Sequence, residues 1–207
     1  MFKRLCVAAA LSIMAFCSPV VWADDVADIR TSGKTFAQAL HDGDAVAAKH
    51  YALTDPTTEK ALDIMAEMTK ARKTLIDASV AKFGDEGKNV AVGGANESRT
   101  EGVQTDFENA KIDVKGDTAT VSSKDGNDSR PVYFKKQNGV WKMDLAKIAN
   151  FSSVTRSASA VHMISDAYTA TAAEIKDGKY KTVQDAKVGV RQNLQAAARK
   201  AATSRGG

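Results

Sequence analysis

The apolar residues of this chain change their period twice, and these changes constrain its fold more than any other feature. Up to Phe83 they recur at three- and four-residue steps, which is typical of amphipathic helices. From Asn109 apolar and polar residues alternate, which predicts strands, and after Asn150 the helical period returns. Helices first and an antiparallel sheet next predict the α+β class, with the helices packed on one side of the sheet.

Start and stop signals delimit three helices in the first part of the chain. Gly43 can take the left-handed conformation that ends a helix, and Asp44 can cap the short helix after it. Asp55 followed by Pro56 marks the start of a long third helix, which stops at Gly84. The predicted helices cover residues 24–40, 45–51 and 56–83.

Strands joined by tight turns follow. Turn-forming residues stand at 115–117, 125–128 and 137–139, and connections this short join antiparallel neighbours. An antiparallel meander of four strands is therefore predicted. Between the third helix and this meander, residues 85–105 are polar and rich in glycine, so a loop is expected there, with one short edge strand from Asn89 to Val92. The residues predicted to face inward are Ala110, Ile112, Val114, Ala119, Val121, Val132, Phe134, Trp141, Met143 and Leu145.

The segment 151–203 is predicted to form a C-terminal helical hairpin. Its first apolar stripe is interrupted at Asp177 and Gly178, and Thr182 with Asp185 resembles a capping box that starts the second helix. The hairpin is alanine-rich, so it either caps an otherwise open sheet or cavity or presents its face to a partner. A disordered tail is expected at 204–207.

The N-terminus has the three-part pattern of a cleaved export signal. Lys3 and Arg4 precede an uncharged apolar run from Leu5 to Cys17, and small residues precede Asp24. The run is shorter than the ~20 residues that span a bilayer, and the bulky Phe16 before Cys17 disfavours lipidation. We expect residues 1–23 to be removed after Ala23 and the protein to be periplasmic or secreted.

Removal of that segment changes what the composition implies. Both cysteines, Cys6 and Cys17, lie within it, so the mature chain would have neither disulfides nor thiol chemistry. Loss of Lys3 and Arg4 lowers the formal charge from +4 to +2. No basic run suggests a nucleic-acid partner, and no second apolar segment suggests a membrane span in the mature chain.

Three segments resemble the nuclear transport factor 2-like superfamily, which includes SnoaL-like and ketosteroid isomerase-like proteins and has a cystatin-like fold. Residues 36–48 (FAQALHDGDAVAA) are similar to its first helix junction, 114–121 (VKGDTATV) to its central hairpin and 134–144 (FKKQNGVWKMD) to its last hairpin. The resemblance covers about residues 24–148. It implies a cone in which three N-terminal helices pack on a curved antiparallel sheet around a mostly apolar cavity, and a domain at 24–150 whose function the family does not specify.

Enzymes of that superfamily place an acid–base pair inside the cone, and the resemblance points to His50 and Tyr51 as the catalytic candidates here. The alternative is that Tyr51 packs in the core while His50 is solvated. Asp113 and Asp144 are expected to point outward, which leaves the cone without the carboxylate that such chemistry needs.

Arg72 lies on the apolar face of the long helix and is the candidate ligand-binding residue. It either anchors a carboxylate or phosphate, or lies along the helix with its charged end in solvent. His41, His50 and His162 are scattered, so neither a metal site nor a cofactor is predicted. Three N-x-S sequons, at Asn96, Asn127 and Asn150, are relevant only in a eukaryote.

These patterns favour an exported, non-enzymatic protein that binds a small apolar ligand or a protein partner through a cone-shaped cavity or the helical hairpin. An isomerase, dehydratase or hydrolase of the ketosteroid isomerase-like type is the first alternative. A structural envelope or assembly protein, such as a homodimer, is the second.

Overall fold

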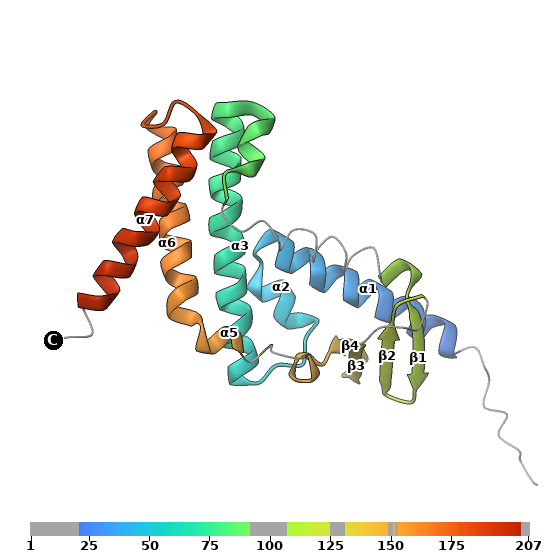
Figure 1. Cartoon of the computed structure of the whole chain (residues 1–207). Helices are drawn as coiled ribbons and strands as arrows, with labels where there is room; N and C mark the ends of the chain where they lie inside the picture. Colours follow the sequence, from blue (N-terminus) through green and yellow to red (C-terminus); the bar gives the residue numbers. More distant parts are fainter. Residues whose placement is uncertain (1–20, 92–106, 125–130, 149–150, 152, 204–207) are drawn as a thin grey trace, which may run out of the picture.

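The computed structural model describes residues 21–91, 107–124, 131–148, 151 and 153–203. It confirms the α+β class, because helices at both ends of the chain flank an antiparallel sheet (Figure 1). The elements are α1 (Val21–Asp42), α2 (Ala45–His50), α3 (Pro56–Phe83), η1 (Gly84–Asn89), β1 (Lys111–Lys115), β2 (Thr118–Ser122), β3 (Val132–Gln137), β4 (Val140–Met143), η3 (Leu145–Lys147), α5 (Ser153–Arg156), α6 (Ala158–Lys176) and α7 (Val183–Thr203).

The helix ends follow the capping residues that the sequence indicates. The Asp44 carboxylate accepts a hydrogen bond from the Ala47 N–H at 2.9 Å, and Asp55 accepts one from the Thr57 N–H at 2.7 Å. Gly43 has a φ of 71°, which is the left-handed conformation expected after α1. The long helix α3 begins and ends where the sequence predicts, since its cap and its Pro56 are local signals.

The sheet is the predicted four-stranded antiparallel meander, in the order β1-β2-β3-β4. Asn138 and Gly139 have φ values of 53° and 79°, as a tight turn between β3 and β4 requires. The turn predicted at 125–128 lies outside the described residues. The outer edge of β4 is covered by the segment that follows α2, because the Met143 N–H donates to the Tyr51 carbonyl and the Leu53 N–H donates to the Met143 carbonyl, both at 2.8 Å.

The edge strand predicted from Asn89 to Val92 is wrong over the described residues. The short helix η1 ends at Asn89, and Val90 is fully buried against the helices. The apolar signal at Val90 therefore reflects packing beneath α3 rather than pairing in a sheet. Gly87 allows η1 to pack closely against α3, because a Cβ at that position would lie 2.4 Å from the carbonyl carbon of Ser79. Val92 lies outside the described residues.

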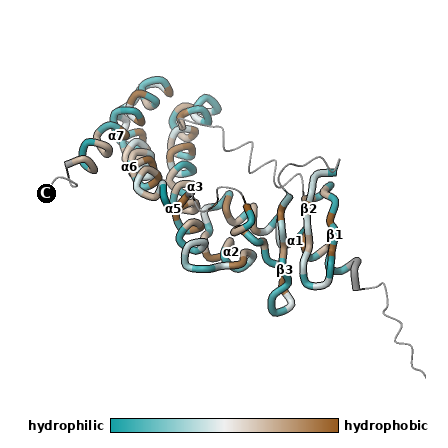
Figure 2. Tube along the Cα trace, turned by 60° about the horizontal axis from the view of Figure 1, so that its bottom comes forward, coloured by the Kyte–Doolittle hydropathy of each residue, from teal (hydrophilic) through white to brown (hydrophobic). Residues whose placement is uncertain are grey.

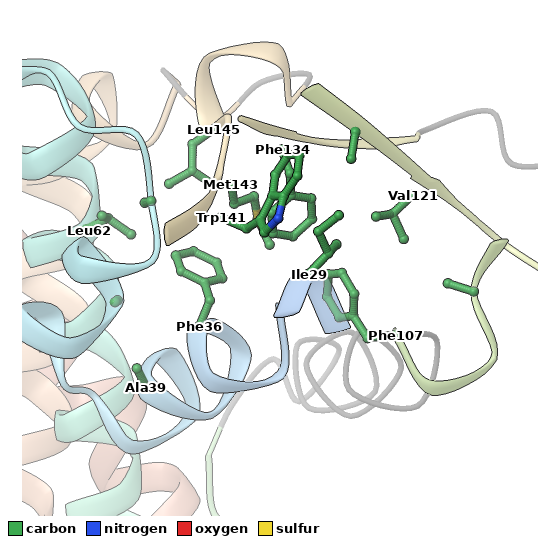
Figure 3. Packing of buried hydrophobic residues seen from close by; sticks show 14 of the residues in the cluster. Ile29, Phe36, Ala39, Leu62, Phe107, Val121, Phe134, Trp141, Met143 and Leu145 are labelled. Carbon is green, nitrogen blue, oxygen red and sulfur yellow. The ribbon is translucent and has the colours of Figure 1, made fainter. Parts of the chain in front are cut away.

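The chain has two hydrophobic cores. In the first core α1 lies over one face of the sheet, and large side chains fill the space between them (Figure 3). Trp141 and Phe134 are 1% and 2% exposed, and the Phe134 ring packs edge-on against Phe107 with ring centroids 6.0 Å apart. Members that Figure 3 labels are Ile29, Phe36, Ala39, Leu62, Phe107, Val121, Phe134, Trp141, Met143 and Leu145.

The second core is formed by the later part of α3 with η1, α6 and α7. Most of its buried members are aliphatic or tyrosine side chains, and its larger fully buried members include Leu75 and Ile175. Helix α3 serves both cores, since Leu62 belongs to the first and Leu75 to the second. The C-terminal hairpin therefore packs along α3 rather than over the sheet (Figures 1 and 2).

Candidate functional site

A groove runs between the C-terminal parts of α3 and α6. Its volume is about 570 Å³, and it is open to solvent along its length. Its apolar lining consists of the exposed Ala81 of α3 and the edges of two buried core residues, Ala78 of α3 and Ile175 of α6. The residues that line it are Thr74, Asp77, Ala78, Ala81, Lys82, Ile175 and Lys176.

The rim of this groove carries uneven charge. The Asp77 carboxylate is already paired with the Lys73 ammonium one helical turn away, at 3.0 Å. Lys82 and Lys176 are exposed, and neither forms an ion pair within the part of the chain that the structure describes. The groove thus combines an apolar floor with a rim whose uncompensated charge is positive.

A hydrogen-bond network in the second core fixes α7 on α6 next to this groove. The Glu174 carboxylate accepts hydrogen bonds from the Tyr180 hydroxyl, the Lys179 ammonium and, at 3.0 Å, the Asn193 amide. The same Asn193 amide also donates to the fully buried Thr171 hydroxyl. Burial by itself raises the pKa of Glu174, but these three donors outweigh it and hold the pKa below its usual value. Every partner of this carboxylate is internal, so its role is structural.

A smaller groove of about 380 Å³ lies beside α1 and is lined by Lys34, Thr35, Gln38 and Glu108. Its charged groups satisfy each other, because Lys34 forms an ion pair with Glu108. The Gln38 amide donates to Asp42 at 2.8 Å, and the Thr35 hydroxyl donates to the Thr31 carbonyl at 2.9 Å. This second groove is therefore the weaker candidate for a binding site.

Asp25 is a buried carboxylate that the sequence did not single out. From α1 it accepts hydrogen bonds from the Trp141 indole N–H at 2.9 Å and the Lys136 ammonium at 2.6 Å. The hydrogen bond from Lys136, followed by that from Trp141, holds the pKa of Asp25 below its usual value against the opposing effect of burial. One signal could have found it: an inward-facing tryptophan needs an acceptor for its N–H.

The catalytic candidates His50 and Tyr51 lie at the end of α2. Their rings pack edge to face with centroids 4.8 Å apart, and Tyr51 is half-buried against the first core while His50 is exposed. Among the described hydrogen bonds, neither side chain meets a carboxylate. This placement matches the alternative in which Tyr51 packs and His50 is solvated. Asp113 and Asp144 pair with Lys115 and Lys147 and do not face the first core.

Arg72 lies in the helical part of the molecule, away from those two residues in the fold. It is half-buried on α3 near Tyr168 of α6. Burial raises the pKa of Tyr168, and the positive charge of Arg72 opposes that rise. Arg72 therefore belongs with the second core, whereas His50 and Tyr51 belong with the first. Ala23, the residue before the predicted cleavage point, is in the first turn of α1.

Within the described ranges, the structure brings together no group of three or more potential metal-ligating side chains. No helix among the described residues has the length and apolar character needed to cross a membrane.

Searches for similar proteins among family models, curated proteins and solved structures find no match to this chain. The α3–α6 groove is consequently interpreted from its own geometry alone.

Proposed function

We propose that this chain is an exported, non-catalytic binding protein whose α3–α6 groove holds an amphipathic helix of a protein partner. The observation that carries the proposal is the groove itself, whose apolar lining between two helices consists of the exposed Ala81 and the edges of the buried Ala78 and Ile175. A helix laid in such a groove is a recurrent mode of peptide recognition. Because the unpaired rim charges are those of Lys82 and Lys176, the partner helix carries acidic residues beside its apolar face.

The packing of the first core favours a protein partner over a small apolar ligand. A ligand in a cone would occupy the space between α1 and the sheet. Among the described residues that space is occupied by Ile29, Phe36, Phe134 and Trp141, all at most 5% exposed. The α3–α6 groove has a larger volume than the groove beside α1, and its lining, unlike that of the smaller groove, includes apolar side chains.

Membership of the nuclear transport factor 2-like superfamily and export are parts of the same proposal. The motifs at 36–48, 114–121 and 134–144 support the first, and the basic and apolar pattern of residues 1–23 supports the second. A non-catalytic role is favoured because His50, Tyr51 and Arg72 do not converge on one cavity. Such enzymes need an acid and a base within reach of the same substrate atoms.

The proposal is tested by site-specific photo-crosslinking in cells of the source organism. Ala81 is replaced by a photoreactive amino acid, since it is exposed on the groove and its substitution leaves the core intact. We expect one partner species to be crosslinked from position 81. Reversal of the rim charge with Lys82→Glu and Lys176→Glu should remove it, because an acidic partner would then be repelled.

Val46 provides the matched control, because it is 81% exposed and lies on α2, which does not contribute to the second core. Crosslinks of equal pattern from positions 46 and 81 would contradict the proposal. So would a crosslink from position 81 that survives the double charge reversal.

A further inference from the structure

The face of the sheet that points away from α1 is basic. Since alternate residues of a strand point to opposite faces, the strand residues between the buried ones place their side chains on this outer face. Lysines outnumber carboxylates there. The charged residues of this outer face are Lys111, Asp113, Lys115, Lys135, Lys142, Asp144 and Lys147.

The carboxylates neutralise only part of this charge. Asp113 pairs with Lys115 at 3.0 Å, and Asp144 pairs with Lys147 at 3.2 Å. Three lysines remain without an ion pair among the described residues, namely Lys111, Lys135 and Lys142. The outer face therefore carries a net positive charge that the sheet itself does not balance.

The arrangement of these lysines opposes sheet stability. Lys135 of β3 and Lys142 of β4 are direct cross-strand partners, and like charges in that relation destabilise a sheet. The same row continues through Thr118 to Lys115 on β1, so it runs across all four strands. Three of the four positions in this row are lysines, of which Lys135 and Lys142 are not neutralised by a carboxylate among the described residues.

Protection of an exposed edge accounts for only some of these residues. Lysines on an edge strand discourage pairing with other chains, and this explains Lys111 and Lys115 on β1. Lys135 is on β3, which has a hydrogen-bonded neighbour on each side, and the far edge of β4 is covered at Met143 by the segment after α2. The Lys135–Lys142 pair consequently needs another explanation.

We propose that this outer face docks on a lipid bilayer that contains anionic headgroups. An ammonium group binds phosphate as a point charge, and a row of lysines across a sheet presents several of them to one flat anionic surface. The hydroxyls of Thr120 and Ser122 lie on the same face and can donate to headgroup oxygens. Neither of the exposed large apolar residues, Val46 and Val188, is on the sheet.

Two other partners fit this face less well. The centre of a protein–protein interface is depleted in lysine, whereas Lys135 lies on a central strand of this face with Lys142 beside it. A single-stranded nucleic acid would stack its bases on aromatic rings. The one aromatic ring among the outward-facing residues of the four strands, that of Tyr133, is covered by the Lys147 ammonium at 5.2 Å from its centroid.

The test is sedimentation of the protein with lipid vesicles. Residues 1–23 are apolar and basic and bind bilayers themselves, so every chain begins at Asp24, the first residue after the predicted cleavage point. We expect binding to vesicles of phosphatidylcholine mixed with phosphatidylglycerol, and none to phosphatidylcholine alone. Binding should weaken as salt is raised, because salt screens charges at this range.

The K135Q/K142Q variant should bind the mixed vesicles on the order of fivefold more weakly for each lysine removed. Its melting temperature should not fall, since the substitutions remove a repulsive pair. The matched control is K82Q/K176Q, which removes the same charge from the α3–α6 groove and should leave vesicle binding unchanged. If this control loses the crosslink to the protein partner but still binds vesicles, the groove and the outer face bind independently, and the two proposals can be distinguished.

Equal binding to both kinds of vesicle would overturn the lipid proposal, as would no binding to the mixed vesicles at low salt. Equal losses in the two double variants would show that only net charge matters and would also overturn it. Finally, release of the protein by soluble polyglutamate at equal charge concentration would identify an acidic polymer rather than a bilayer as the partner.

Discussion

The two cores of this protein bury their side chains in different ways. The first core, between α1 and the sheet, is filled by large residues such as Trp141, Phe134 and Phe36. The second, between α3, α6 and α7, is filled by aliphatic residues and by Tyr168 and Tyr180, and it borders a polar network around Glu174. Aliphatic side chains bury less apolar area per residue than the indole and phenyl rings of the first core. Hydrogen bonds are therefore expected to contribute a larger part of the stability of the second core than of the first.

The same difference locates the candidate sites. Large side chains leave little space inside the first core, so its available surface is the outer face of the sheet. The second core has the open α3–α6 groove along its side. Each half is thus expected to bind through a surface that its own packing leaves free.

The largest predicted effect concerns the first core. Phe134→Ala should lower the free energy of unfolding by about 3–5 kcal/mol, since it removes a fully packed aromatic ring. In the second core the removal of a single methyl group, Ala172→Gly, should cost only about 1 kcal/mol. Urea unfolding followed by circular dichroism measures both. Lys135→Ala on the outer face is the control and should change stability by less than about 0.5 kcal/mol. Similar costs for Phe134→Ala and Ala172→Gly would contradict the contrast between the cores.

Each core has one carboxylate with a lowered pKa beside it, the buried Asp25 in the first and the half-buried Glu174 in the second. Their substitution should have a smaller effect than Phe134→Ala, with a defined pH dependence. Asp25 and Glu174 bind fewer protons in the folded chain than in the unfolded one. Their contribution is therefore present above their usual pKa values and is lost as the pH falls through the folded-state values. We expect Glu174→Gln to cost about 1.5–3 kcal/mol at neutral pH, because three donors lose a charged acceptor.

Asp25→Asn is the counterpart in the first core and loses one charged donor, Lys136, while the Trp141 bond can persist. Unfolding measured between neutral and acidic pH should show a flatter profile for both variants than for the wild type. If the free energy of unfolding of either variant falls with decreasing pH as steeply as that of the wild type, the carboxylate concerned does not stabilise the fold.

The smallest predicted effect is a gain in the second core. The Ser79 hydroxyl is fully buried and has no hydrogen-bond partner among the described residues. Ser79→Ala should therefore raise the free energy of unfolding by about 1 kcal/mol, since an unsatisfied polar group is removed. Thermal unfolding would show the higher melting temperature. Thr58→Ala is a useful contrast, because the Thr58 hydroxyl donates to Asp55 and its removal should destabilise.

Local features of the fold were predictable from residues close together in the chain. The Asp44 and Asp55 caps, the turn at Asn138–Gly139 and the capping box of Thr182 with Asp185 all appear in the structure. The short strand at Asn89–Val92 was wrong because Val90 is buried by α3 and the helical hairpin, which its neighbours in sequence do not reveal.

The candidate sites were less predictable for the same reason. His50, Tyr51 and Arg72 were selected by residue type and helical face, but the helix α3 carries Arg72 into the second core. The Asp25 site joins residues 116 positions apart, and the α3–α6 groove joins α3 to a helix almost a hundred residues later. No short-range pattern encodes such pairs.

The sequence by itself determined the α+β class, the positions of the helices and strands, and the order of the strands in the meander, because periodicity, caps and tight turns act over a few residues. Only the tertiary structure decided that α3 is shared by two cores, that the C-terminal hairpin packs along α3, and that unpaired lysines line up on the outer face of the sheet. These features depend on contacts between distant segments, and their energies arise only when those segments meet.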